Sequence, residues 1–177
     1  SLKVTQNLSA ATVSSTSVTS FSSTANTFIE TPTTFFVSQG DAQNRRFVMR
    51  NETILDGTPT SLYIDGSSIL AKIPTNTTWH VNARVVCRTD AANAKYAAFE
   101  RKCLINRNSL VNTTEIVGPV QVIGSDIGSD TGSPPVGWDV NLLADPTNGA
   151  LDIKVTGTDS DTIRWVAEIN LVEVAFN

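Results

Sequence analysis

The sequence is short of histidine, cysteine and charge. Its 177 residues include one histidine, His80, and two cysteines, Cys87 and Cys103, so few metal sites or catalytic triads can be built from them. Charged residues make up 17% of the chain, below the roughly 25% usual in globular domains, and neutral Ser, Thr and Asn replace them. We therefore expect a polar, weakly charged surface.

Basic clusters and long apolar runs are also missing. The chain has 13 Lys and Arg against 17 Asp and Glu, a formal net charge of -4, and no stretch collects the basic side chains that neutralise phosphates. No apolar run approaches the roughly 18 residues that a membrane-spanning helix needs. Nucleic acid and membranes are therefore not expected as partners.

Residues 1–38 differ in kind from the rest of the chain. Nearly half of them are Ser or Thr, and the only charged side chains are Lys3 and Glu30. Hydroxyl side chains compete for backbone hydrogen bonds and disfavour helix, and the scattered apolar residues follow neither helical nor strand spacing. We expect an extended N-terminal arm, either disordered or laid along a neighbouring subunit. It shows no signal-peptide pattern.

Four large apolar side chains in the arm are costly to leave in water. They are Phe28, Ile29, Phe35 and Phe36, and all fall near the end of the arm. Extended segments can bind a partner by adding to its sheet and by inserting apolar side chains into its grooves. These four residues are therefore the candidate partner-binding residues.

Residues 39–177 show short alternating runs separated by Gly, Pro, Asn and Asp, as in all-β sandwiches and barrels. In 77–88, for example, Trp79, Val81, Val85 and Cys87 share one face, which predicts a half-buried strand. The pattern predicts one all-β domain, an antiparallel two-sheet β-sandwich of jelly-roll type. Roughly eight strands are expected from nine candidate runs, at 43–55, 62–65 and 69–73 as a hairpin, 77–88, 95–107, 115–123, 138–143, 151–156 and 162–176.

The two cysteines are tested by the geometry of the expected hairpin. If 77–88 and 95–107 pair around a turn near residue 91, Cys87 lies opposite residue 95 or 96, and Cys103 lies opposite Trp79 or His80. The two thiols are then too far apart for a disulfide, which needs a Cα separation of about 4.4–6.8 Å. Two free, buried thiols are predicted, which suits assembly in a reducing cytoplasm.

Neither catalysis nor metal binding has a marked site. His80 is expected at the surface or at an interface, because it lies on the polar face of its strand. Glycoside hydrolysis needs only two carboxylates, but no such pair stands out, so no catalytic residue is assigned. Asp126 with Asp130, and separately Asp159 with Asp161, could place oxygens around Ca²⁺, but turn formation is the favoured interpretation of both loops. No metal or cofactor is expected.

Two further patterns are assigned to ordinary surface roles. Asn-X-Ser/Thr triplets begin at Asn7, Asn51, Asn76 and Asn112. Their number is close to chance in a chain this rich in these residues, so glycosylation is not expected. Arg45 and Arg46 are too few for a nucleic-acid patch and are predicted to form surface or intersubunit ion pairs.

An ordered set of motifs runs through residues 40–173, about three quarters of the chain. It resembles a β-domain that recurs in exterior virion proteins of tailed bacteriophages, tail fibres among them. The resemblance implies a non-enzymatic domain, commonly part of a homotrimer, without catalytic residues. The motifs are GDAQ at 40–43, TPT at 58–60, LYIDGSS at 62–68, IPTNTTW at 73–79, RTDA at 88–91, INRN at 105–108, WDV at 138–140, DPTNGA at 145–150, VTG at 155–157 and TIRWVA at 162–167.

The resemblance leads to one main hypothesis and two rivals. The main hypothesis is a surface-exposed virion protein assembled in the host cytoplasm: a capsid decoration or cement subunit, or a short head fibre. Its arm would contact the major capsid protein or neighbouring subunits. The alternative is a tail-fibre or receptor-binding protein that contacts a host-surface glycan or receptor through the loop at 124–137, which is longer here than in the usual pattern. A capsule-degrading glycosidase is the third possibility.

Overall fold

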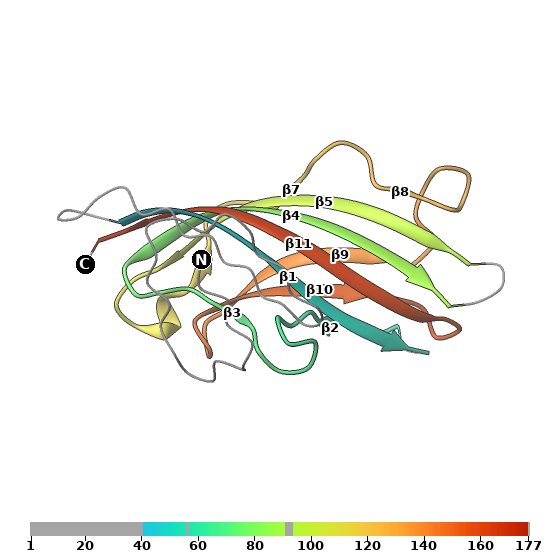
Figure 1. Ribbon diagram of the computed structural model, residues 1–177, viewed down its shortest axis with the longest axis horizontal. Helices are drawn as coiled ribbons and strands as arrows, with labels where there is room; N and C mark the ends of the chain where they lie inside the picture. Colours follow the sequence, from blue (N-terminus) through green and yellow to red (C-terminus); the bar gives the residue numbers. More distant parts are fainter. Residues whose placement is uncertain (1–40, 56, 91–93, 177) are drawn as a thin grey trace, which may run out of the picture.

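The computed structural model describes residues 41–55, 57–90 and 94–176, and these form two antiparallel sheets (Figure 1). The expected arm at 1–38 lies outside the described residues, and so do Phe28, Ile29, Phe35 and Phe36. Within the described part, no helix is long and apolar enough to cross a membrane.

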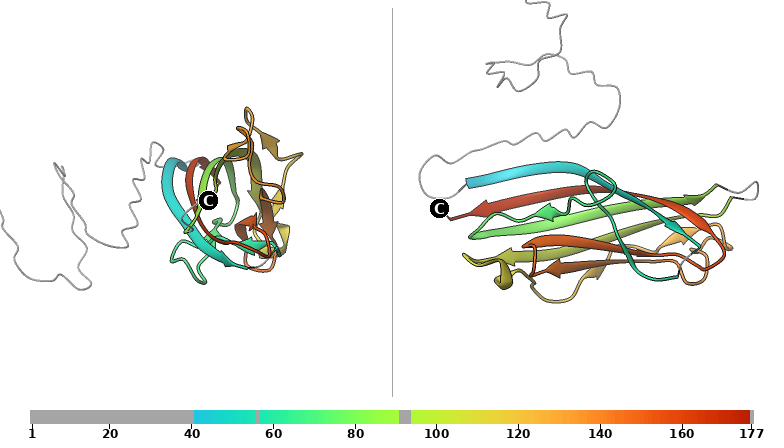
Figure 2. Two further views of the ribbon diagram at one scale, coloured as in Figure 1. Left: turned by 90° about the vertical axis from the view of Figure 1, so that its right-hand side faces the viewer. Right: turned by 90° about the horizontal axis from the view of Figure 1, so that it is seen from below.

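The larger sheet has seven strands, and four of them run along most of the molecule. Their order is β1 (Asp41–Ile54), β11 (Thr162–Ala175), β4 (Thr77–Thr89) and β5 (Tyr96–Arg107). Three short strands pair with the free side of β5: β6 (Glu115–Ile116), β7 (Gln121–Val122) and β8 (Ile127–Gly128). The sheet is visibly twisted and curved when seen along the long axis (Figure 2).

The smaller sheet is centred on β10 (Ala150–Thr156). It pairs along its length with β9 (Asp139–Asp145) on one side, through a turn at 145–149. On its other side lie β2 (Thr60–Ser61) and β3 (Ala71–Lys72). A single turn of 3₁₀ helix, η1 (Val111–Thr113), connects β5 to β6.

One hydrophobic core lies between the two sheets. Side chains alternate along each long strand, so that every second residue faces the core. Trp79, Trp138 and Trp165 are all buried there, and the rings of Trp138 and Trp165 lie 5.7 Å apart between centroids. The expected all-β architecture with two antiparallel sheets is confirmed, whereas its description as a β-sandwich of jelly-roll type stays a prediction.

The described chain enters and leaves at the same end. Asp41 pairs with Ala175, and Ala175 pairs with Thr77, so the start of β1 and the finish of β11 are side by side (Figure 1). We call this the proximal end. The opposite, distal end is where Ile54 pairs with Thr162.

Two expected elements differ from the structure. The segment 115–123 is not one strand but two, because Gly118, with a φ of 76°, and Pro119 interrupt it between β6 and β7. The expected hairpin of 62–65 with 69–73 is reduced to one backbone bond, in which the Ile64 N–H donates to the Ile69 carbonyl at 2.8 Å. Leu62 donates to the Ile153 carbonyl of β10, and both β2 and β3 pair with β10 rather than with each other.

Candidate functional site

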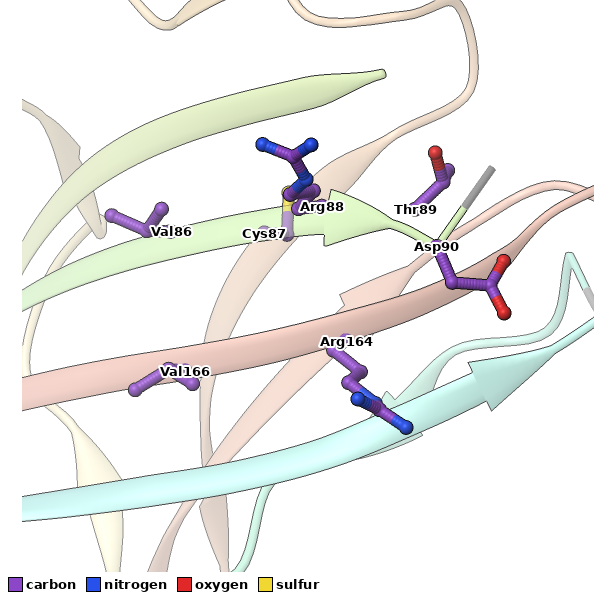
Figure 3. A pocket seen from close by; sticks show the side chains of 7 residues that line it. All are labelled: Val86, Cys87, Arg88, Thr89, Asp90, Arg164 and Val166. Carbon is purple, nitrogen blue, oxygen red and sulfur yellow. The ribbon is translucent and has the colours of Figure 1, made fainter. Parts of the chain in front are cut away.

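A groove lies near the distal end, on the outer face of the seven-stranded sheet, the face turned away from the core. In the register of β4 and β11, Val86 stands opposite Val166 and Arg88 stands opposite Arg164. The two valines, 59% and 48% exposed, form an apolar floor beside the row of the two arginines (Figure 3). Together with Asp90 they line a volume of about 380 Å³, which we call the distal groove.

The two arginines of the distal groove differ in their partners. Arg164 Nε donates to Glu52 Oε2 at 2.8 Å, and this bond raises the pKa of the guanidinium above its ordinary value. Arg88 stands opposite Arg164, and like charges on neighbouring strands repel each other. The Arg88 guanidinium forms no hydrogen bond or ion pair with any residue of the described chain. Among the described residues nothing occupies the donors of Arg88, which can therefore bind a group that enters the groove.

A second groove continues from the first across β11 towards β1, with a volume of about 360 Å³. It shares Arg164 and Val166 with the distal groove and adds Arg50, Glu52 and Asp65. The two grooves together make one shallow track across the strands, in which guanidinium and carboxylate groups surround the apolar floor.

Asp65 closes the tight turn that borders the second groove. Its carboxylate accepts hydrogen bonds from the backbone N–H groups of Ser67, Ser68 and Ile69 at 2.9–3.0 Å. These bonds hold the pKa of Asp65 far below its usual value of 3.8, so the group is a fixed anion. The turn expected at 65–68 is confirmed.

The chemistry of the track is suited to binding. Guanidinium groups recognise anions and hydroxyl groups through a planar fork of donors, and the valines can pack against an apolar face. A general acid requires a carboxyl group that keeps its proton. Glu52 is instead held by Arg164, and Asp65 is held by its turn. Asp65 is therefore an ion, and the Glu52 carboxylate is occupied by its hydrogen bond from Arg164.

A buried arginine fixes the loop at 124–137, the predicted contact loop. The side chain of Arg101 on β5 is only 5% exposed. Its two terminal guanidinium nitrogens donate hydrogen bonds to the two carboxylate oxygens of Asp126, at 2.6 and 2.8 Å. Its Nε donates to the Val140 carbonyl of β9 at 3.0 Å, and the bond to Asp126 raises its pKa. The loop is thereby attached to both sheets at one point.

The acidic residues considered for Ca²⁺ are not gathered into one site. Asp126 is held by Arg101, Asp159 accepts from the Gly57 N–H at 2.9 Å, and Asp161 accepts from Lys95 at 2.9 Å. Within the described residues, no group of three or more His, Cys, Asp or Glu side chains could hold a metal ion. The loops carrying these residues are tied down by direct bonds.

Both cysteines are free and buried, which confirms that prediction. Burial raises the pKa of each thiol to about 12. The expected hairpin register was wrong by one or two residues: Cys87 lies opposite Ala97, and Cys103 lies opposite Val81. Both side chains belong to the hydrophobic core, and Cys87 is also among the residues that line the distal groove.

His80 and the arginine pair lie where the sequence suggested. His80 is exposed on the outer face, and Arg45 and Arg46 form ion pairs within the chain. Arg45 reaches the buried Glu173 at 3.4 Å, while Arg46 pairs with Glu168. Of the Asn-X-Ser/Thr triplets, the one at Asn7 lies outside the described residues.

No family model matches this chain, and no curated protein matches it. Two solved structures of phage tailspikes are similar to it. One is the tailspike protein gp49 from Acinetobacter baumannii bacteriophage Fri1, a capsular polysaccharide depolymerase, with a TM-score of 0.40 and 8% identity over 84% of this chain and 21% of that chain. The other is the Acinetobacter phage vB_ApiP_P1 tailspike protein, with a TM-score of 0.39 and 12% identity over 97% and 26%. This chain therefore spans about a fifth to a quarter of their length.

The sequence interpretation missed the groups that form the track and anchor the loop. Arg101 lies between Phe99 and Cys103 at a core-facing position of its strand, and Glu173 lies likewise between Leu171 and Ala175. A charged residue in such a position signals a buried ion pair. The pairing of Arg88 with Arg164 left no local signal, because β4 and β11 are far apart in the sequence.

Proposed function

We propose that this chain is a non-enzymatic structural β-domain on the exterior of a bacteriophage particle. The observation that carries the proposal is that the residues of the motif set build the fold. Trp79 and Trp165 fill the core, while Asp65 and Asp145 close turns by accepting backbone N–H bonds. The motifs that carry the resemblance are therefore residues that form the core and the turns. The resemblance implies a family of domains displayed on virions.

The arrangement of the two ends supports an attached and displayed domain. The arm joins β1 at the proximal end, beside the finish of β11. The distal groove and β8, which belongs to the 124–137 loop, both lie towards the other end (Figure 1). A subunit attached by its arm, in a homotrimer, would hold these features away from the attachment point.

The distal groove favours a contact role on a tail appendage over decoration of the head. Its unused Arg88 donors and apolar floor suit a host-surface glycan or receptor group, and a purely architectural subunit has no need of them. Capsid decoration or cement, or a short head fibre, is the second position to be tested. Gold labelling of intact particles should place few copies at the tail, whereas many copies over the head would contradict the tail position.

Deleting residues 1–38 should leave a folded domain that no longer joins the particle. The reason is that an arm with few charges and four large apolar side chains binds by burying them in a partner. Circular dichroism would check the fold, and immunoblotting of purified particles would check incorporation.

A full-length control separates arm length from arm chemistry. Replacing Phe28, Ile29, Phe35 and Phe36 by serine keeps the length and should also prevent incorporation. Persistence of either variant on purified particles would rule out the arm as the tether.

Arg88→Ala should weaken attachment of particles to host cells by roughly tenfold or more, the effect of losing a charged hydrogen-bond donor. Arg84→Ala is the matched control, since Arg84 lies four residues away on the same face of β4 and is occupied by Glu168 at 2.6 Å. Adsorption of particles carrying each variant is measured against wild type. Equal adsorption of the Arg88 and Arg84 variants would contradict a contact role for the groove.

Release of sugar from host polysaccharide by the purified protein would contradict the non-enzymatic assignment.

A further inference from the structure

A patch of uncharged side chains covers the proximal part of the outer face. Val172 of β11, His80 of β4 and Leu104 of β5 stand in one row, and Val174 and Thr78 stand in the next. Val172 and Val174 are 57% and 50% exposed, and Leu104 is 39% exposed. We call these five residues the proximal patch.

The patch differs from the rest of the outer face. The next row inward carries Lys102 and Arg46, and the row beyond it carries Glu168, Arg84 and Glu100. Val172 and Val174 are neighbours on the outer face of β11, and Leu104 lies across His80 on β5, so three exposed apolar side chains gather in two adjacent rows. Single exposed valines are ordinary, whereas grouped ones favour a surface that another segment covers. The patch contains no Asp, Glu, Lys or Arg, so a strongly charged partner would match it poorly.

We propose that the proximal patch is the seat of the chain's own arm, through the apolar segment at 28–37. This segment has Phe28, Ile29, Phe35 and Phe36 but one charged residue, Glu30, so its chemistry matches the patch. The proposal goes beyond the proposed function and does not depend on it.

The connection between arm and domain makes this seat accessible. The arm ends at Asp41, which pairs with Ala175 and thus lies beside Val174 of the patch. Five residues separate Phe36 from Asp41, and an extended chain of that length reaches roughly 17 Å. The patch is two strand spacings wide, about 10 Å, so Phe36 can reach across it. Ser38 and Gly40 are residue types that favour turns.

Tethering also raises the effective concentration of the segment. A short linker holds it near the patch at a millimolar level, so even weak apolar contacts are occupied. The arm's apolar side chains are then covered in the free subunit, and a binding partner must displace them from the patch.

A protease that cleaves after glutamate tests the proposal on the full chain, because Glu30 is the single such site within residues 1–40. Val172→Asp should speed cleavage at Glu30 by roughly tenfold or more, since cleavage follows the population of the undocked arm. Val166→Asp is the matched control: it lies on the same strand and face, is 48% exposed, and should leave the rate unchanged. Cleavage is measured by mass spectrometry after thermal melting has confirmed that both variants fold.

A second variant makes the test specific to the contact. Replacing Phe35 and Phe36 by serine should speed cleavage as Val172→Asp does, and combining the changes should add nothing more. Additive effects, or a wild-type rate already equal to that of Val172→Asp, would overturn the proposal. Protection that disappears on dilution would assign the seat to the arm of a second copy and overturn the docking of the chain's own arm.

Discussion

Replacing Arg101 by methionine should lower the free energy of unfolding by about 2–4 kcal/mol. Breaking a buried ion pair leaves its partner uncompensated, which typically costs roughly 3–5 kcal/mol. Here the expected loss is somewhat smaller, because Asp126 is 25% exposed and keeps some contact with water. Methionine preserves most of the side-chain volume, so the loss reports the missing charge and hydrogen bonds rather than a cavity.

The measurement is chemical denaturation, with limited proteolysis as a second readout. Arg84→Met is the control, since Arg84 is 55% exposed and its surface ion pair should contribute no more than about 1 kcal/mol. In the Arg101 variant, proteases should cut the 124–137 loop while the long strands stay intact. An unfolding free energy within about 0.5 kcal/mol of wild type would show that Arg101 does not anchor the loop.

Both thiols should react at least roughly 1,000-fold more slowly in the folded protein than in the denatured one at pH 8. The nucleophile is the thiolate, and a pKa of about 12 leaves very little of it at that pH. Because burial raises the pKa, the protonated form persists and the rate should increase as the pH rises towards 12.

Titration with a chromogenic thiol reagent before and after denaturation measures this protection. Without reductant, the denatured chain should show two sulfhydryls, those of Cys87 and Cys103. Val86→Cys is the control for reagent access, because Val86 is the neighbour of Cys87 on the exposed face of β4. A denatured, unreduced chain with no reactive thiol would contradict the free cysteines.

Alternation predicted the long strands because each has one buried and one solvated face. In β4, Trp79 and Val85 face the core, while His80 and Arg84 face outward, and this pattern is visible in the letters of the sequence. The pairing register between β4 and β5 was harder to predict from the sequence. Thr89 is the last residue of β4, and its N–H donates to the Lys95 carbonyl at the start of the turn. Composition does not reveal at which residue the pairing of the two strands stops.

The track and the loop anchor depend on contacts that no local pattern contains. Arg101 could be recognised as a charge in a core position, but its partner Asp126 comes from a loop whose path is fixed only by the fold. Arg88 and Arg164 become neighbours because β11 pairs with β4 rather than with its sequence neighbour β10. Sequence therefore indicated the class of fold, and tertiary pairing created the candidate site.

The antiparallel ladder of β1 with β11 has a mechanical consequence. Its hydrogen bonds run across the strands, and the 14-residue β1 forms one edge of the sheet. A pull on Asp41 against Ala175 would open the ladder like a zipper, one pair at a time. Tension that enters through the arm and is resisted at the distal end would instead shear every pair at once. The β1–β11 ladder therefore resists force along the long axis of the domain better than force that separates its two proximal strand ends.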